Sequence, residues 1–191
     1  YRDTSKEDTG YVGLQNQGAT CYMNSLLQSL FHIPAFRKIV YNMPTSEQDD
    51  IKTSIPLCLQ RLFAKLQFSS ENCSTKELTT SFGWNDHQTF IQHDVQEFCT
   101  VLIDKLSEKM KGTPLENSLS SLLGGKFKSY IRCVDVDYES SKIEDFFDLS
   151  MIVKGCADLK KSFETYVEPE HLDGDNQYKT DEYGPQNAIM G

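Results

Sequence analysis

One stretch near the start of the chain constrains the fold most strongly, because it places a reactive side chain where a loop becomes a helix. Residues 13–28 read Gly-Leu-Gln-Asn-Gln-Gly-Ala-Thr-Cys-Tyr-Met-Asn-Ser-Leu-Leu-Gln, with the cysteine at position 21. The apolar residues that follow recur at the spacing of one helix face: Met23, Leu26, Leu27, Leu30 and Phe31. Thr20 fits the N-cap position, so the sequence predicts a helix from about Cys21 to His32.

A cysteine in the first turn of a helix is well placed to act as a nucleophile. The unpaired backbone N–H groups and the helix dipole favour negative charge there, and the thiolate is the nucleophilic form of cysteine. Asn16 lies five residues upstream of Cys21. Its amide is expected to fold back and to form an oxyanion hole with the Cys21 backbone N–H. The alternative is that Cys21 is an inert core residue, a common role of a free cysteine.

The whole string resembles the cysteine box of the ubiquitin-specific proteases, a family of papain-like deubiquitinases. The shared pattern is Gly-Leu-x-Asn-x-Gly-x-Thr-Cys-Tyr-Met-Asn-x-x-Leu-Gln. The resemblance implies an α+β fold in which a helical thumb precedes β-rich fingers and palm. It also implies Cys21 and Asn16 as catalytic residues, Tyr22 in substrate binding, and ubiquitin and ubiquitinated proteins as partners, without a cofactor. Ala19 stands where most members carry Asn, and this variant is similar to the herpesvirus-associated subgroup.

A second motif, residues 92–98, opens a predicted helix. Asp94 with Glu97 three residues later fits the acidic form of a capping box. The same string resembles the second box of the ubiquitin-specific proteases, in which an acidic residue and a glutamine hold the ubiquitin tail. By that resemblance Asp94, Gln96 and Glu97 bind the tail. The two roles are compatible, because a cap uses only part of a carboxylate.

A third motif, residues 172–178, resembles the finger region of the same family. In many members a Cys-x-x-Cys zinc half-site follows it, and its partner lies on an earlier hairpin. Here residues 179–183 contain no cysteine, and the hairpin retains only Cys133. One thiolate cannot hold a structural zinc, so no metal is expected. Asp173 and Asp175 in this motif are expected to contact ubiquitin.

A cysteine protease also needs a histidine base, oriented by Asp or Asn. The four histidines are His32, His87, His93 and His171, and none lies in the Gly-His-Tyr context of the family base. His32 would lie roughly 16 Å from Cys21 along the predicted helix, at about 1.5 Å per residue. The resemblance therefore covers the first part of a catalytic domain, and the chain alone is expected to be inactive.

The sequence is compatible with two other functions. One is a non-catalytic ubiquitin-binding module that lacks the histidine base. The other is a redox protein, which is disfavoured because no resolving cysteine lies near Cys21.

Charge is unevenly distributed along the chain, whose formal net charge is −9. Residues 1–134 hold 14 acidic and 14 basic side chains, whereas residues 135–191 hold 14 acidic and 5 basic ones. This surplus argues against nucleic acid as a partner. It is either a solubilising surface or a docking face for a basic partner.

The cysteines and the apolar runs bear on the cellular compartment. Six cysteines occur without a C-x-x-C pair, and the polar N-terminus does not resemble a signal peptide. No apolar run reaches the length of a membrane span. We therefore expect a protein of the cytoplasm or nucleus that does not associate with a membrane.

Periodicity divides the chain near Gly124. Residues 1–10 are a polar tail, and further helices are predicted over 36–41, 55–66, 75–82 and 95–110. Residues 83–90, with Trp84, are interpreted as a loop that orders on ubiquitin. Cys58 is expected in the core and Cys73 at the surface.

Beyond Gly124 the sequence is rich in β-formers. A hairpin is predicted from strands 126–136 and 146–153 joined by the polar link 138–144, followed by a helix over 159–166. The expected organisation is a helical thumb lobe at 11–124 and the first part of a β fingers/palm lobe at 125–191.

Overall fold

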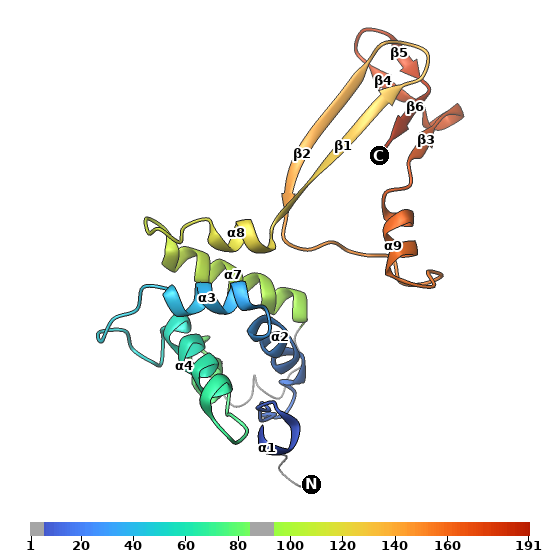
Figure 1. The fold of residues 1–191 in the computed structure, drawn as a ribbon. Coiled ribbons are helices and arrows are strands. Elements are labelled where there is room, and N and C mark those ends of the chain that lie inside the picture. The colour runs from blue at the N-terminus through green and yellow to red at the C-terminus, as the bar shows by residue number, and fades with distance from the viewer. Residues whose placement is uncertain (1–5, 85–93) are drawn as a thin grey trace. The chain divides into compact units, whose positions relative to one another are not determined.

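The computed structural model describes residues 6–84 and 94–191, and the chain divides into a helical unit, residues 1–122, and a β-rich unit, residues 123–191 (Figure 1). The expected loop at 83–90 therefore lies mostly outside the described residues. None of the described helices is long and apolar enough to cross a membrane.

Most of the described helices of the first unit follow the predicted periodicity, but the short helices at 6–9 and 118–123 were not predicted. They are α1 (Lys6–Thr9), α2 (Cys21–Phe31), α3 (Pro34–Asn42), α4 (Ile55–Phe68), α5 (Lys76–Ser81), α7 (Val95–Met110) and α8 (Ser118–Leu123). The four longer predicted helices are confirmed, with ends that differ by at most two residues. Within the expected polar tail, Lys6–Thr9 forms one turn, fixed by a bond from the Lys6 N–H to the Ser70 carbonyl (2.9 Å).

The core of this unit lies where α4 meets α3, α5 and α7, and where α2 meets α3 and α7. Phe63 on α4 is fully buried, and its ring lies 5.3 Å from that of Phe31 on α2 and 6.2 Å from that of Phe36 on α3. Apolar burial of this kind stabilises by about 25 cal/mol per Å². The core therefore fixes the position of α2, whose first residue is Cys21.

The exposure of two cysteines can be compared with the sequence prediction. Cys58 is buried, as predicted. The prediction that Cys73 is exposed is wrong, since only 5% of its surface is accessible. Its backbone bridges Leu14, with Cys73 N–H donating to the Gly13 carbonyl and Gln15 N–H donating to the Cys73 carbonyl. This pairing draws the loop that contains Cys73 inward.

The second unit is built on an antiparallel sheet with the strand order β2-β1-β6-β3, next to a two-stranded ribbon of β4 and β5 (Figure 1). Its elements are β1 (Gly125–Cys133), β2 (Glu139–Phe146), α9 (Leu159–Tyr166), β3 (Glu170–Leu172), the 3-10 turn η1 (Gly174–Asn176), β4 (Tyr178–Thr180), β5 (Gly184–Gln186) and β6 (Ala188–Met190). The predicted helix at 159–166 is confirmed.

The prediction of the second hairpin strand at 146–153 is wrong. The segment expected to be a polar link forms β2 instead, in register from Gly125↔Phe146 to Arg132↔Glu139. The alternation rule assumes one buried face, but the side chains of β2 are exposed or half-buried along its whole length. Ion pairs across the hairpin join Lys126 to Asp145 and Arg132 to Glu139, so polar residues suit this strand.

Candidate active site

The loop that leads into Cys21 is anchored to the helical unit by side-chain amides. Gln28 on α2 donates to the Val12 carbonyl at 2.8 Å, and Asn24 donates to the Gln15 carbonyl at 3.1 Å. The Gln15 amide donates to Asn72 at 2.7 Å. Each bond satisfies a polar group of a segment that has no regular backbone ladder of its own.

Buried threonines hold the second half of the loop. The Gln17 amide donates to the Thr75 hydroxyl at 2.6 Å, and its backbone N–H donates to the Thr20 hydroxyl at 3.0 Å. Thr20 and Thr75 are each only 1% exposed. Gly18 has φ +114°, a backbone conformation that favours glycine. The loop is therefore held in one conformation just ahead of the helix.

Cys21 is the first residue of α2, as predicted, and its side chain is exposed. Thr20 is the N-cap, and its carbonyl accepts from the Asn24 N–H at 3.0 Å. Its hydroxyl makes no capping bond to the helix. It donates instead to Asn16 Oδ1 at 2.9 Å, and the Thr20 N–H donates to the same oxygen at 3.1 Å. The residues expected to act as nucleophile and oxyanion donor are thus joined through Thr20.

Tyr22 and Trp84, both expected to contact substrate, lie in an aromatic cluster. The Tyr22 ring meets that of Phe98 edge to face at 6.2 Å, and Tyr22 is 9% exposed. The Trp84 ring lies 5.7 Å from Phe98 and 5.5 Å from Phe82. The Tyr22–Phe98 contact of this cluster joins α2, which begins at Cys21, to α7. The substrate role of both residues stays a prediction.

The second motif begins α7. Asp94 is the N-cap, as predicted, but its carboxylate accepts from the Gln96 N–H at 2.7 Å, one position earlier than the capping-box pattern implies. Asp94, Gln96 and Glu97 are all exposed. One carboxylate oxygen is used as a cap, which leaves the other available for a ligand.

The third motif lies in the second unit. Asp173 precedes η1 and Asp175 lies within it, and both side chains are exposed. The nearby Tyr178 ring lies 6.1 Å from that of Tyr138, and the Tyr178 side chain raises the pKa of Tyr138. Cys133 is buried in the sheet opposite Ala188. Among residues 6–84 and 94–191, no three His, Cys, Asp or Glu side chains gather as a metal site would require.

The histidines fall into three groups. His32 is the C-cap of α2, at the opposite end of that helix from Cys21, and its Nδ1 lies 2.8 Å from the Gln28 carbonyl. His171 belongs to β3. His87 and His93 lie outside the described residues. Neither described histidine has been assigned a catalytic role by the sequence.

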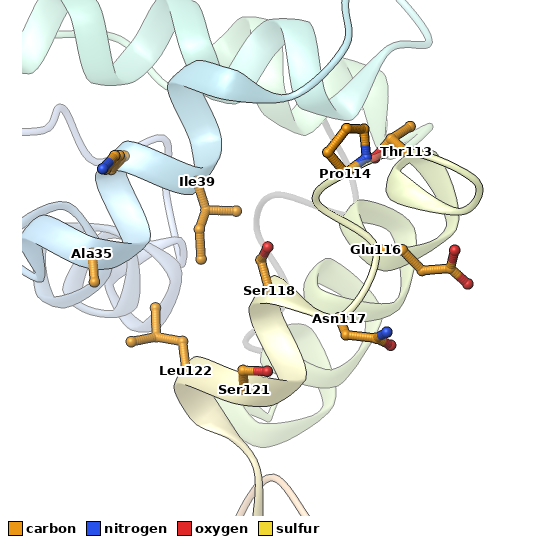
Figure 2. A pocket seen from close by; sticks show the side chains of 10 residues that line it. Ala35, Ile39, Thr113, Pro114, Glu116, Asn117, Ser118, Ser121 and Leu122 are labelled. Carbon is orange, nitrogen blue, oxygen red and sulfur yellow. The ribbon is translucent and has the colours of Figure 1, made fainter.

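A surface hollow of about 710 Å³ lies away from these motifs, between α3 and the segment that leads into α8. Figure 2 shows Ile39 of α3 and Leu122 of α8 directed into it, with Ser118 and Ser121 alongside. None of the residues that the sequence assigns to the site lines this hollow.

The chain is similar to known proteins over most of its length. Residues 12–173 match the family model described as ubiquitin carboxyl-terminal hydrolase. The chain is 55% identical to ubiquitin C-terminal hydrolase 12 of Arabidopsis thaliana and 54% identical to ubiquitin carboxyl-terminal hydrolase 15 of Schizosaccharomyces pombe, over 98% of its length in both cases. It is 52% identical to ubiquitin carboxyl-terminal hydrolase 7 of Drosophila melanogaster over the same share. The chain spans 16–17% of the length of these relatives.

The burial of the cysteines predicts their order of alkylation. Burial raises the pKa of the Cys58 and Cys73 thiols, so less thiolate is present at any pH below that pKa. With iodoacetamide near pH 8, we expect Cys21 to react at least about tenfold faster than either. Peptide mass spectrometry over time measures the rates, and a denatured sample serves as the control. Equal native rates at Cys21 and Cys73 would contradict the described burial.

Proposed function

We propose that this chain, which belongs to the ubiquitin carboxyl-terminal hydrolase family, carries the nucleophile of a cysteine-dependent deubiquitinase. The observation that supports this most directly is Cys21 at the first position of α2, preceded by an Asn16 side chain that Thr20 holds in place. The relatives named above are all called ubiquitin hydrolases. Because the chain spans a small part of each, the activity of the whole protein is the proposal.

The proposed reaction is acyl transfer at the ubiquitin C-terminus. Cys21 Sγ attacks the carbonyl carbon of the last glycine, and the carbonyl oxygen takes the electron pair. The Cys21 backbone N–H and Asn16 Nδ2 donate to this oxyanion. When the carbonyl re-forms, the bond to the leaving amine breaks and the amine takes a proton. Water then attacks the thioester, releases ubiquitin and restores the thiol.

The proton transfers need an acid–base group, which contributes about 10²–10⁴-fold in rate. We propose a histidine from outside this chain, since the relatives are several times longer. This chain alone is then expected to bind ubiquitin without turnover. A non-catalytic ubiquitin-binding module is the second candidate, and it is favoured only if Cys21 proves dispensable.

The first test replaces the two residues in the full-length protein. With a fluorogenic ubiquitin substrate, Cys21→Ala should reduce turnover to background. Loss of one oxyanion donor in Asn16→Ala should lower kcat by about 10²–10³-fold. Cys156→Ala, which changes a half-exposed cysteine of the other unit, is the matched control and should retain activity. A ubiquitin probe with a C-terminal electrophile gives a further check. If it still labels Cys21→Ala, the assignment of Cys21 as the nucleophile is refuted.

We also propose that the acidic second unit docks ubiquitin electrostatically, with Asp173 and Asp175 among the contacts. Because exposed charges are screened by salt, their effect falls mainly on association.

The double variant Asp173→Asn, Asp175→Asn should therefore associate with ubiquitin about two- to fivefold more slowly at low salt and show little change at high salt. Stopped-flow binding measures both rates. The double variant Glu71→Gln, Asp104→Asn removes the same charge from exposed positions of the first unit and serves as the control. A change confined to dissociation would contradict steering.

Within the family we propose membership of the herpesvirus-associated subgroup. Two features support it, namely Ala19 in the cysteine box and a finger region that retains only Cys133. Elemental analysis of the purified full-length protein should then detect no stoichiometric zinc bound to its catalytic domain. One zinc per chain, lost on replacement of Cys133, would contradict this assignment.

A further inference from the structure

The Asn16 side chain has only one orientation that the surrounding donors allow. Its Oδ1 lies 3.1 Å from the Thr20 backbone nitrogen and 2.9 Å from the Thr20 hydroxyl. A backbone N–H can only donate, so the amide group that faces it must be the oxygen. The Nδ2 group of Asn16 is therefore directed elsewhere. It makes no hydrogen bond within the described part of the chain, and Asn16 is exposed.

The Thr20 hydroxyl is constrained in the same way. Its Oγ1 accepts from the Gln17 N–H at 3.0 Å, which is also an obligate donor. Its single proton is thus left for Asn16 Oδ1. Thr20 is 1% exposed, so both of its donors are shielded from water. The hydroxyl forgoes the capping bond that a threonine usually makes at an N-cap.

We propose that Thr20 is a positioning residue of the acyl-transfer reaction. Its hydroxyl and backbone N–H together occupy Asn16 Oδ1, which presents Asn16 Nδ2 as the donor to the oxyanion formed at Cys21. This inference rests on the proposed function. It adds a residue that acts only through Asn16 and does not touch the substrate.

The test compares Thr20→Val with Thr20→Ser in the full-length protein, using a fluorogenic ubiquitin substrate. Valine has nearly the shape of threonine but lacks the hydroxyl, and it leaves the Asn16 amide held by one bond. For Thr20→Val we expect kcat to fall about tenfold relative to the unchanged protein, while KM stays within twofold. This pattern is typical of a donor that stabilises the transition state. Serine restores the hydroxyl and should recover kcat to within about threefold.

A double-mutant cycle separates positioning from a general loss of structure. If Thr20 acts through Asn16, Thr20→Val should lower kcat little in an Asn16→Ala background, since residues that act as a unit are non-additive. A tenfold loss that persists in that background, or no recovery with serine, would overturn the proposal.

A second variant covers the case in which Thr20→Val does not fold. Asn16→Asp keeps an oxygen for Thr20 but turns the outward donor into an acceptor, so kcat should fall as far as in Asn16→Ala, at unchanged melting temperature. Full activity of Asn16→Asp would overturn the proposal. Failure of the proposed function itself has a different result, because Cys21→Ala would then remain active.

Discussion

The two hydrogen bonds from Thr20 to Asn16 Oδ1 are the interaction on which the candidate site depends. They join Thr20, the N-cap residue of α2, to Asn16, the residue proposed to stabilise the oxyanion. Both donors belong to the buried Thr20, and a buried donor that is left without a partner costs about 1–3 kcal/mol of stability. The loop is therefore held in place before a substrate arrives, which is the condition for electrostatic preorganisation.

The helical core holds both α2 and the loop that precedes it. Phe31 of α2 packs on Phe63 of α4, and Tyr22 of α2 packs on Phe98 of α7, so both ends of α2 are fixed. The bridge between Leu14 and Cys73 ties the start of the loop to the same unit. Sites held by helices and strands are more precise than sites on loops. Cys21, at the junction, combines a rigid backbone with an exposed thiol.

The sequence predicts the local parts of this structure and not the non-local ones. The start of α2 and the Asp94 cap follow from helical periodicity and cap chemistry, which lie within a few residues. The bond between Gln17 and Thr75, by contrast, joins positions 58 residues apart. Strand β2 was not predicted, because the alternation rule for strands requires one apolar face. Both faces of β2 are exposed or half-buried and carry charged residues. The bonds that orient Asn16 do not follow from the sequence pattern, although the cysteine motif itself predicts the candidate site.

The most direct measurement is a crystal structure of the full-length protein joined to ubiquitin through a C-terminal aldehyde. The hemithioacetal oxygen at Cys21 stands in for the oxyanion. We predict that this oxygen lies about 2.7–3.1 Å from Asn16 Nδ2, while Asn16 Oδ1 still accepts both bonds from Thr20. An oxygen held by other groups, with Asn16 turned away or its bonds to Thr20 broken, would contradict the account.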